Sequence, residues 1–149
     1  MLRPNKCVDV MYPEPFTLTH LHAYEFKTSV QAGFPSPAED HIGKRIDVLK
    51  KLVRHPAATV QMRVVGESMR DLGIFDGDYI LIDRAITPSN GHIVVAVIDG
   101  EFLIKKLVIR AGQMKLKAGN PTFADIIPKD GQTITIFGVV LTAFKQFPV

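Results

Sequence analysis

At 149 residues, with 46% hydrophobic residues and nine phenylalanines, the chain can bury one core, which predicts a single compact domain with short arms. A formal net charge of +3 permits contact with nucleic acid without requiring it, because no dense run of Lys and Arg occurs. The single cysteine, Cys7, excludes an internal disulfide framework. With no leader and no apolar run of membrane-spanning length, we expect a soluble, cytoplasmic protein.

Residues 1–31 contain three prolines and little periodicity, which predicts an extended arm. Their charges balance, which argues against a basic DNA-binding arm, and the segment is too short for a helix-turn-helix domain. Next come Ala32 and Gly33, two small residues ahead of Pro35 and Pro37. Their plain interpretation is an accessible linker. The alternative is a scissile bond, because a protease needs an extended segment that fits a narrow cleft.

The rest of the chain is predicted to form one helix and then a series of strands. Apolar residues at helical spacing from Lys44 to Arg54 predict a helix that Pro56 ends. Asp99-Gly100 predicts a tight hairpin turn. Alternation, apolar runs and turn signals predict strands over 59–65, 78–83, 92–98, 101–110, 113–118 and 134–144. The expected fold is mainly β: a compact, curled antiparallel β domain with a short helix and an extended N-terminal arm.

The first predicted strand ends before Gly66, and Ser68 follows two residues later, where the chain must turn. A serine exposed at the end of a strand suits a nucleophile, although most serines at such places are turn residues. A serine hydroxyl also needs an adjacent base. The candidate base is Lys105, since burial among the apolar residues of strand 101–110 lowers the pKa of an amine.

Alternation along strand 101–110 barely separates Lys105 from Lys106, because both faces of the strand are apolar. Arg110 shares the face of Lys106, which favours Lys105 as the buried lysine. A triad of Ser68 with His92 and Asp83 remains open, although no spacing recommends it.

Other chemistries find little support in the sequence. Ser68 lacks a nucleophile elbow, because Arg70 stands where the second glycine would be. No Gly-rich phosphate loop occurs, and Cys7 has no local activating base. We expect no metal and no cofactor, because no zinc-ligand spacing occurs among the five histidines, His20, His22, His41, His55 and His92.

Several stretches together resemble one family, the LexA/UmuD family of self-cleaving proteins, and within it the UmuD branch. The resemblance covers about residues 31–140. The stretches are Ala32–Ala38, His55–Thr59, Gly66-Glu67-Ser68-Met69, Asp76-Gly77-Asp78, Asp99–Phe102 and Lys105-Lys106-Leu107.

The resemblance implies a serine–lysine dyad in which Lys105 deprotonates Ser68, and Ser68 attacks the Ala32 carbonyl of the Ala32–Gly33 bond. Backbone amides near Ser68 would stabilise the oxyanion. Residues 1–32 would then be a removable arm, and residues 33–149 the self-cleaving domain. The usual scissile pair of the UmuD branch is Cys-Gly, whereas Ala-Gly is typical of the repressor branch.

The resemblance further implies a role in the SOS response to DNA damage. A RecA-type recombinase filament on single-stranded DNA would stimulate cleavage, and the product, a homodimer, would join a Y-family polymerase subunit in error-prone translesion synthesis. One alternative is a LexA-like repressor, or a phage-repressor relative, that lacks its DNA-binding domain. The absence of a recognisable DNA-binding domain argues against a repressor. A signal peptidase acting in trans and a binding module without chemistry are further alternatives.

Overall fold

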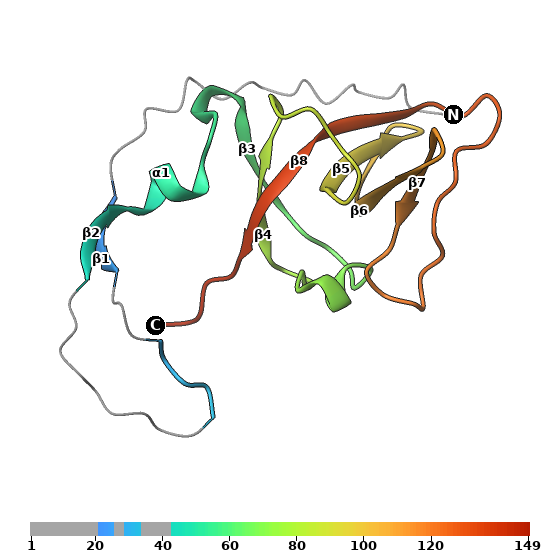
Figure 1. The fold of residues 1–149 in the computed structure, drawn as a ribbon. Coiled ribbons are helices and arrows are strands. Elements are labelled where there is room, and N and C mark those ends of the chain that lie inside the picture. Colours follow the sequence, from blue (N-terminus) through green and yellow to red (C-terminus); the bar gives the residue numbers. More distant parts are fainter. Residues whose placement is uncertain (1–20, 26–28, 34–42) are drawn as a thin grey trace, which may run out of the picture.

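The computed structural model describes residues 21–25, 29–33 and 43–149. Its main feature is a six-stranded, antiparallel sheet with the strand order β3-β4-β8-β5-β6-β7. The sheet curls but is not closed into a barrel, since β3 and β7 are its edges (Figure 1). This confirms the predicted mainly β, antiparallel fold. The strands are β3 Thr59–Arg63, β4 Tyr79–Asp83, β5 Ile93–Ile98, β6 Glu101–Arg110, β7 Gln113–Lys117 and β8 Ile134–Phe144.

The helix predicted from Lys44 to Arg54 is wrong in its first part. Lys44–Asp47 is strand β2, which pairs antiparallel with β1, His22–Glu25, in a separate two-stranded sheet. Helix α1 covers only Val48–Leu52. The Asp47 side chain caps it by accepting a hydrogen bond from the Lys50 amide at 3.2 Å, which places the start of the helix after Asp47. Pairing with the arm thus overrides the helical periodicity of residues 44–47.

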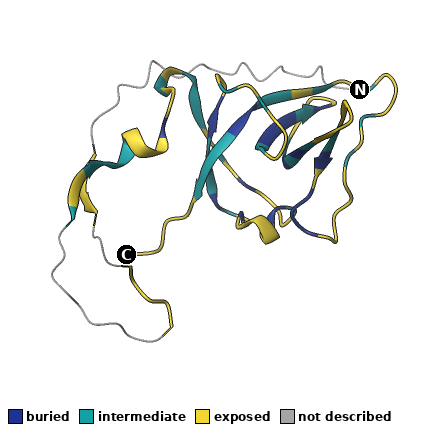
Figure 2. Cartoon of the chain, viewed as in Figure 1, coloured by how far each residue is buried: buried dark blue, intermediate teal, exposed yellow. Residues whose placement is uncertain are grey.

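Strand β5 supplies buried side chains to both faces of the sheet, which explains its nearly continuous apolar sequence. Val95 belongs to one core cluster, and Val94 and Ala96 belong to the other. The first cluster is completed by Val64, Met69, Ile74, Ile80 and Ile82. Figure 2 shows the burial concentrated in the central strands, while the β1–β2 unit is largely exposed.

Strand β8 joins the two halves of the sheet by pairing with both β4 and β5. Its register shifts opposite Leu81/Ile82 and again opposite Val95/Ala96, and such bulges bend a strand. The Asp99-Gly100 hairpin is confirmed, since both residues have positive φ, 51° and 84°, and β5 pairs directly with β6. No helix among the described residues is long and apolar enough to cross a membrane.

Two short 3-10 helices flank β3 in the described part of the chain. They are η1, Pro56–Ala58, before β3, and η2, Arg70–Leu72, between β3 and β4.

Candidate functional site

The Ser68 loop, residues 64–69, connects β3 to η2 and is anchored at both ends. Val64 and Met69 are buried in the first core cluster, and Met69 has no exposed surface. Gly66 has a φ of 96°, a conformation that favours glycine, and its amide donates to Asp76 Oδ1 at 2.7 Å. Ser68, two residues later, is half-buried. The loop therefore holds Ser68 at the end of a strand on a fixed backbone.

The Asp76-Gly77-Asp78 stretch fastens this loop from the other side. The Gly77 amide donates to the Val64 carbonyl at 2.9 Å, and the Val64 amide donates to the Asp78 carbonyl at 2.8 Å. Strand β3 ends at Arg63, two residues before the predicted end of strand 59–65. The Asp78 carboxylate is buried, accepts from the Phe75 amide at 2.9 Å and lies 3.3 Å from Lys145 Nζ. This stretch thus has a structural role.

Lys105 lies beside Ser68. Its Nζ is 2.8 Å from Ser68 Oγ and also donates to the Ile104 carbonyl at 3.1 Å. Only 7% of the Lys105 surface is exposed, and burial lowers its pKa below the ordinary value of 10.5, because the charged amine loses hydration. A buried amine with a lowered pKa, in hydrogen-bond contact with a hydroxyl, is the arrangement that general-base activation of a serine requires.

Lys106 points to the other face of β6 and lines a different cavity. The structure therefore brings together Ser68 and Lys105, the pair that the sequence analysis chose, and keeps Lys106 apart. The catalytic roles of Ser68 and Lys105 remain predictions.

A second loop, residues 118–120 after β7, braces the Ser68 loop. The Gly119 amide donates to the Ser68 carbonyl at 2.7 Å, and the buried Asn120 side chain donates from Nδ2 to the Glu67 carbonyl at 2.9 Å. Asn120 Oδ1 in turn accepts from the Thr122 amide at 3.1 Å and hydroxyl at 2.8 Å. The carbonyls on both sides of the Ser68 amide are thus fixed.

Sequence reasoning missed the bracing role of Asn120, because Gly119-Asn120-Pro121 has the composition of an ordinary turn. A Cβ atom on Gly119 would lie 2.8 Å from Leu72 Cγ and 3.2 Å from the Met69 Cα atom, so only glycine allows this close approach. The Gly119-Asn120-Pro121 motif was the only signal in the sequence, and spacing alone does not reveal the partner of Asn120.

Ser68 and Lys105 open into a cleft of about 430 Å³ between the Ser68 loop and strand β6. Its other walls are largely apolar, from Val65, Phe102 and Phe123. Neither Ala32 nor Gly33 lines this cleft. Both are exposed, and no atom of the described residues beyond Gly33 and its chain neighbours lies within 4 Å of where a Gly33 Cβ would be. The predicted scissile bond therefore lies outside the cleft in this conformation.

The alternative triad is not assembled. Asp83, fully buried, lies 2.7 Å from His55 Nδ1, and its Oδ1 accepts from the Ala85 amide. His92 contacts Ser89, with Nε2 3.1 Å from the hydroxyl. The structure thus gives His92 and Asp83 other partners, and Lys105 is the titratable side chain that contacts Ser68. His20, His41 and Cys7 lie outside the described residues.

Comparison with known proteins identifies the family. A family model described as "Peptidase S24-like" matches residues 24–141. ImpA of Salmonella typhimurium is 41% identical over 116 residues, 77% of this chain and 78% of ImpA. MucA of Escherichia coli is 38% identical over 120 residues, 80% of this chain and 82% of MucA. The LexA repressor of Frankia alni is 37% identical over 117 residues, 78% of this chain but 45% of the repressor. The chain belongs to the Peptidase S24-like family and, within it, to the UmuD-like proteins.

Proposed function

We propose that the chain is a protease that cleaves its own Ala32–Gly33 bond with a serine–lysine dyad. The observation that carries this proposal is the 2.8 Å contact between Lys105 Nζ and Ser68 Oγ, made by a lysine whose pKa is lowered by burial. The neutral amine of Lys105 takes the hydroxyl proton while Oγ attacks the Ala32 carbonyl carbon. The C–N bond then breaks, and the proton on Lys105 passes to the Gly33 nitrogen.

Hydrolysis completes the reaction. A water molecule, deprotonated by Lys105, attacks the Ala32 acyl ester on Ser68 and releases the Ala32 carboxylate and the serine hydroxyl. In both steps the negative charge forms on the Ala32 carbonyl oxygen. Amides of the Ser68 loop are the donors that we assign to it, because bonds from Gly119 and Asn120 hold the orientation of this backbone.

The segment around Ala32 must enter the cleft before this chemistry begins. Residues 29–33 are exposed, and an extended backbone with small side chains suits the narrow, apolar cleft beside Ser68. Entry, more than chemistry, is therefore the step that a partner would control. We assign that control to a RecA-type recombinase filament on single-stranded DNA, in the SOS response to DNA damage.

After cleavage, we propose that the product acts in the cytoplasm as a homodimeric accessory subunit of a Y-family, error-prone translesion polymerase. The similarity to ImpA, MucA and SamA, which extends over about four fifths of each chain, supports this assignment. A LexA-like repressor is the second candidate, favoured by the 37% identity to the Frankia alni repressor. The match covers only 45% of that repressor, so more than half of the repressor is not matched by this chain.

Incubation of the purified chain at alkaline pH, followed by mass spectrometry, tests the self-cleavage. The large product is expected to begin Gly33-Phe34-Pro35. Ser68→Ala and Lys105→Ala are each expected to leave the chain intact without unfolding it, because they remove only the nucleophile or the base.

Lys106→Ala is the matched control, since it removes the neighbouring lysine from the opposite face of the same strand. It is expected to retain substantial cleavage. A product with a different first residue contradicts the assigned bond. An inactive Lys106→Ala variant beside an active Lys105→Ala variant contradicts the assigned base.

A further inference from the structure

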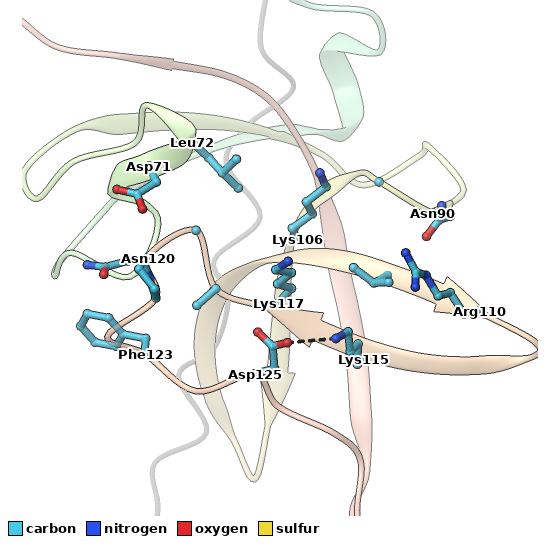
Figure 3. A pocket seen from close by; sticks show the side chains of 15 residues that line it. Asp71, Leu72, Asn90, Lys106, Arg110, Lys115, Lys117, Asn120, Phe123 and Asp125 are labelled. Atoms are coloured by element: carbon cyan, nitrogen blue, oxygen red, sulfur yellow. Dashed lines mark hydrogen bonds and ion pairs between the residues drawn. The ribbon is translucent and has the colours of Figure 1, made fainter.

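One face of the β6–β7 hairpin is strongly basic. Lys106 and Arg110 lie on the same face of β6, four residues and roughly 13 Å apart. Lys117 of β7 is the direct partner of Lys106 in the sheet, and Lys115 is the partner of Val108. The side chains of Val108 and of these four basic residues line one groove of about 850 Å³ (Figure 3). Four cations therefore face the same cavity from two adjacent strands.

The fold itself does not explain this charge arrangement. Like charges directly opposite each other in a sheet are destabilising, and Lys106 faces Lys117 in this way. Lys115 has a partner, since its Nζ lies 3.0 Å from Asp125 Oδ2. That hydrogen bond, with a further contribution from Lys117, lowers the pKa of the Asp125 carboxyl. Lys106 and Arg110 form no salt bridge with any carboxylate in the part of the chain that the structure describes.

The opposite wall of the groove supplies an aromatic ring, polar groups and the carboxylate of Asp71. It is formed by residues 71–72 and by the loop after β7, which carries Phe123. The Phe123 residue is 45% exposed, although it is a large apolar residue, and it also borders the Ser68 cleft. An exposed ring across the groove from a row of cations combines a stacking surface with charge.

We propose that this groove binds the phosphodiester backbone of single-stranded nucleic acid without base preference. Lys106, Lys117 and Arg110 contact successive phosphates, and Phe123 stacks on an unpaired base. A concave groove accepts a flexible single strand, whereas a rigid duplex needs a convex element that enters its grooves. The aromatic ring distinguishes this ligand from an acidic peptide, for which the cations alone would be sufficient.

The proposal is tested with the full chain carrying Ser68→Ala, so that self-cleavage, whether or not it occurs in the native chain, does not affect the result. Fluorescence anisotropy measures binding of a labelled oligothymidine of about 20 nucleotides, longer than one site of this kind. With three phosphates neutralised, the logarithm of the affinity is expected to fall against the logarithm of the salt concentration with a slope of about −2. No binding at low salt overturns the proposal.

Lys106→Ala with Lys117→Ala is expected to weaken binding at low salt at least tenfold and to make the slope shallower by about 1.4, because two phosphate contacts are lost. Lys50→Ala with Lys129→Ala is the control, since both lysines are exposed, lie outside the groove and remove the same charge. An equal loss in the control pair overturns the proposal, because binding then depends on net charge alone.

Phe123→Ala separates the two kinds of anionic ligand. It is expected to weaken oligothymidine binding severalfold and to leave any weak binding of polyglutamate unchanged. If polyglutamate binds as tightly as oligothymidine, with the same lysine dependence and no effect of Phe123→Ala, the proposal is overturned. The ligand of the groove is then an acidic peptide. A DNA duplex of equal length that binds more tightly than the single strand also overturns the proposal.

Discussion

In the proposed mechanism, burial of Lys105 sets the pH dependence of cleavage. The amine acts as a base only when neutral, and burial lowers its pKa below 10.5. The first-order rate of self-cleavage is therefore expected to rise with pH as the neutral fraction of Lys105 grows. The midpoint of the rise is expected below pH 10.5, and the rate levels off above that midpoint. Gel densitometry across neutral to alkaline pH measures this curve.

Lys105→Arg tests the same point, because a guanidinium stays protonated at every pH in this range. It is expected to show no cleavage even at alkaline pH, while Lys106→Ala keeps the native midpoint. A rate that does not change between neutral and alkaline pH contradicts lysine as the base and points to a different group or step.

Asn120 is a positioning residue whose effect on cleavage we expect to exceed its effect on folding. Its Nδ2 donates to the Glu67 carbonyl, one residue before Ser68, the proposed nucleophile. Removing a buried hydrogen-bond partner costs roughly 1–3 kcal/mol. If that loss falls on the geometry of Ser68, Asn120→Ala lowers the cleavage rate by about tenfold to hundredfold.

Two comparisons separate positioning from general destabilisation. The pH midpoint of Asn120→Ala is expected to match that of the native chain, since Lys105 is untouched. Thr122→Val removes only the hydroxyl that donates to Asn120 Oδ1 and leaves the bond to Glu67, so it is expected to slow cleavage less. Native cleavage rates for Asn120→Ala would show that the Ser68 loop holds its shape without this bond.

Strand β8 depends on a glycine where it crosses the core. A Cβ atom at Gly138 would lie 2.6 Å from Ile82 Cγ2 and 2.9 Å from the Asp83 carbonyl oxygen. The second contact is to backbone of the neighbouring strand, which cannot rotate away. Gly138→Ala is therefore expected to lower the free energy of unfolding by about 2 kcal/mol, as overpacking does in other cores.

Urea denaturation of the Ser68→Ala chain, with and without Gly138→Ala, measures this difference. Thr135→Ala is the control on the same strand, because Thr135 is exposed; it is expected to change the stability by less than about 1 kcal/mol. An unchanged midpoint for Gly138→Ala would mean that β4 and β8 separate to accept the methyl group.

Local signals predicted the strands well where turn chemistry set their ends. Strands β6 and β8 have the predicted bounds, and the Asp99-Gly100 turn fixes the register of β5 against β6. Residues 44–47 were predicted as helix because their pattern is helical, yet they pair with β1, which is distant in sequence. Such non-local pairing leaves no trace in a short window.

The Ser68–Lys105 pair could be predicted from local sequence signals, whereas the basic groove on β6 and β7 could not. Ser68 and Lys105 were predictable as a pair from a strand end and a buried lysine, although alternation separated Lys105 from Lys106 only weakly. The basic groove was not predicted, because Lys106, Arg110, Lys115 and Lys117 form no dense run in the sequence. They gather only when Gly112 reverses the chain and β7 pairs with β6.

Cleavage at the proposed bond would change more than the length of the chain. It removes β1 from its pairing with β2, and it removes Leu21 from an apolar cavity of about 670 Å³ that Leu49 and Phe144 also line. The product therefore exposes a strand edge and apolar surface that the intact chain covers, which are features of a protein-binding surface.

The intact chain is expected to bind no specific duplex sequence. A repressor inserts an element into the major groove to read base edges. Helix α1 has five residues, and η1 and η2 have three each, so no described helix can fill that role. The charged residues of segment 1–31, most of which lies outside the described residues, sum to zero. Binding through the groove on β6 and β7 is expected to be sensitive to salt and indifferent to sequence.

Selection of bound fragments from a genomic DNA pool tests this expectation with the Ser68→Ala chain. At salt concentrations that suppress phosphate contacts, no sequence should be enriched. A protein binds a specific site roughly 10³-fold or more tightly than random DNA only when it reads the bases. In the same assay series, the fragment 33–149 is expected to bind a Y-family polymerase subunit and to support synthesis past a template lesion, which the uncleavable chain does poorly. Enrichment of one tight, salt-resistant operator-like sequence would instead identify the chain as a repressor, since neither the groove nor the Ser68 cleft reads base edges.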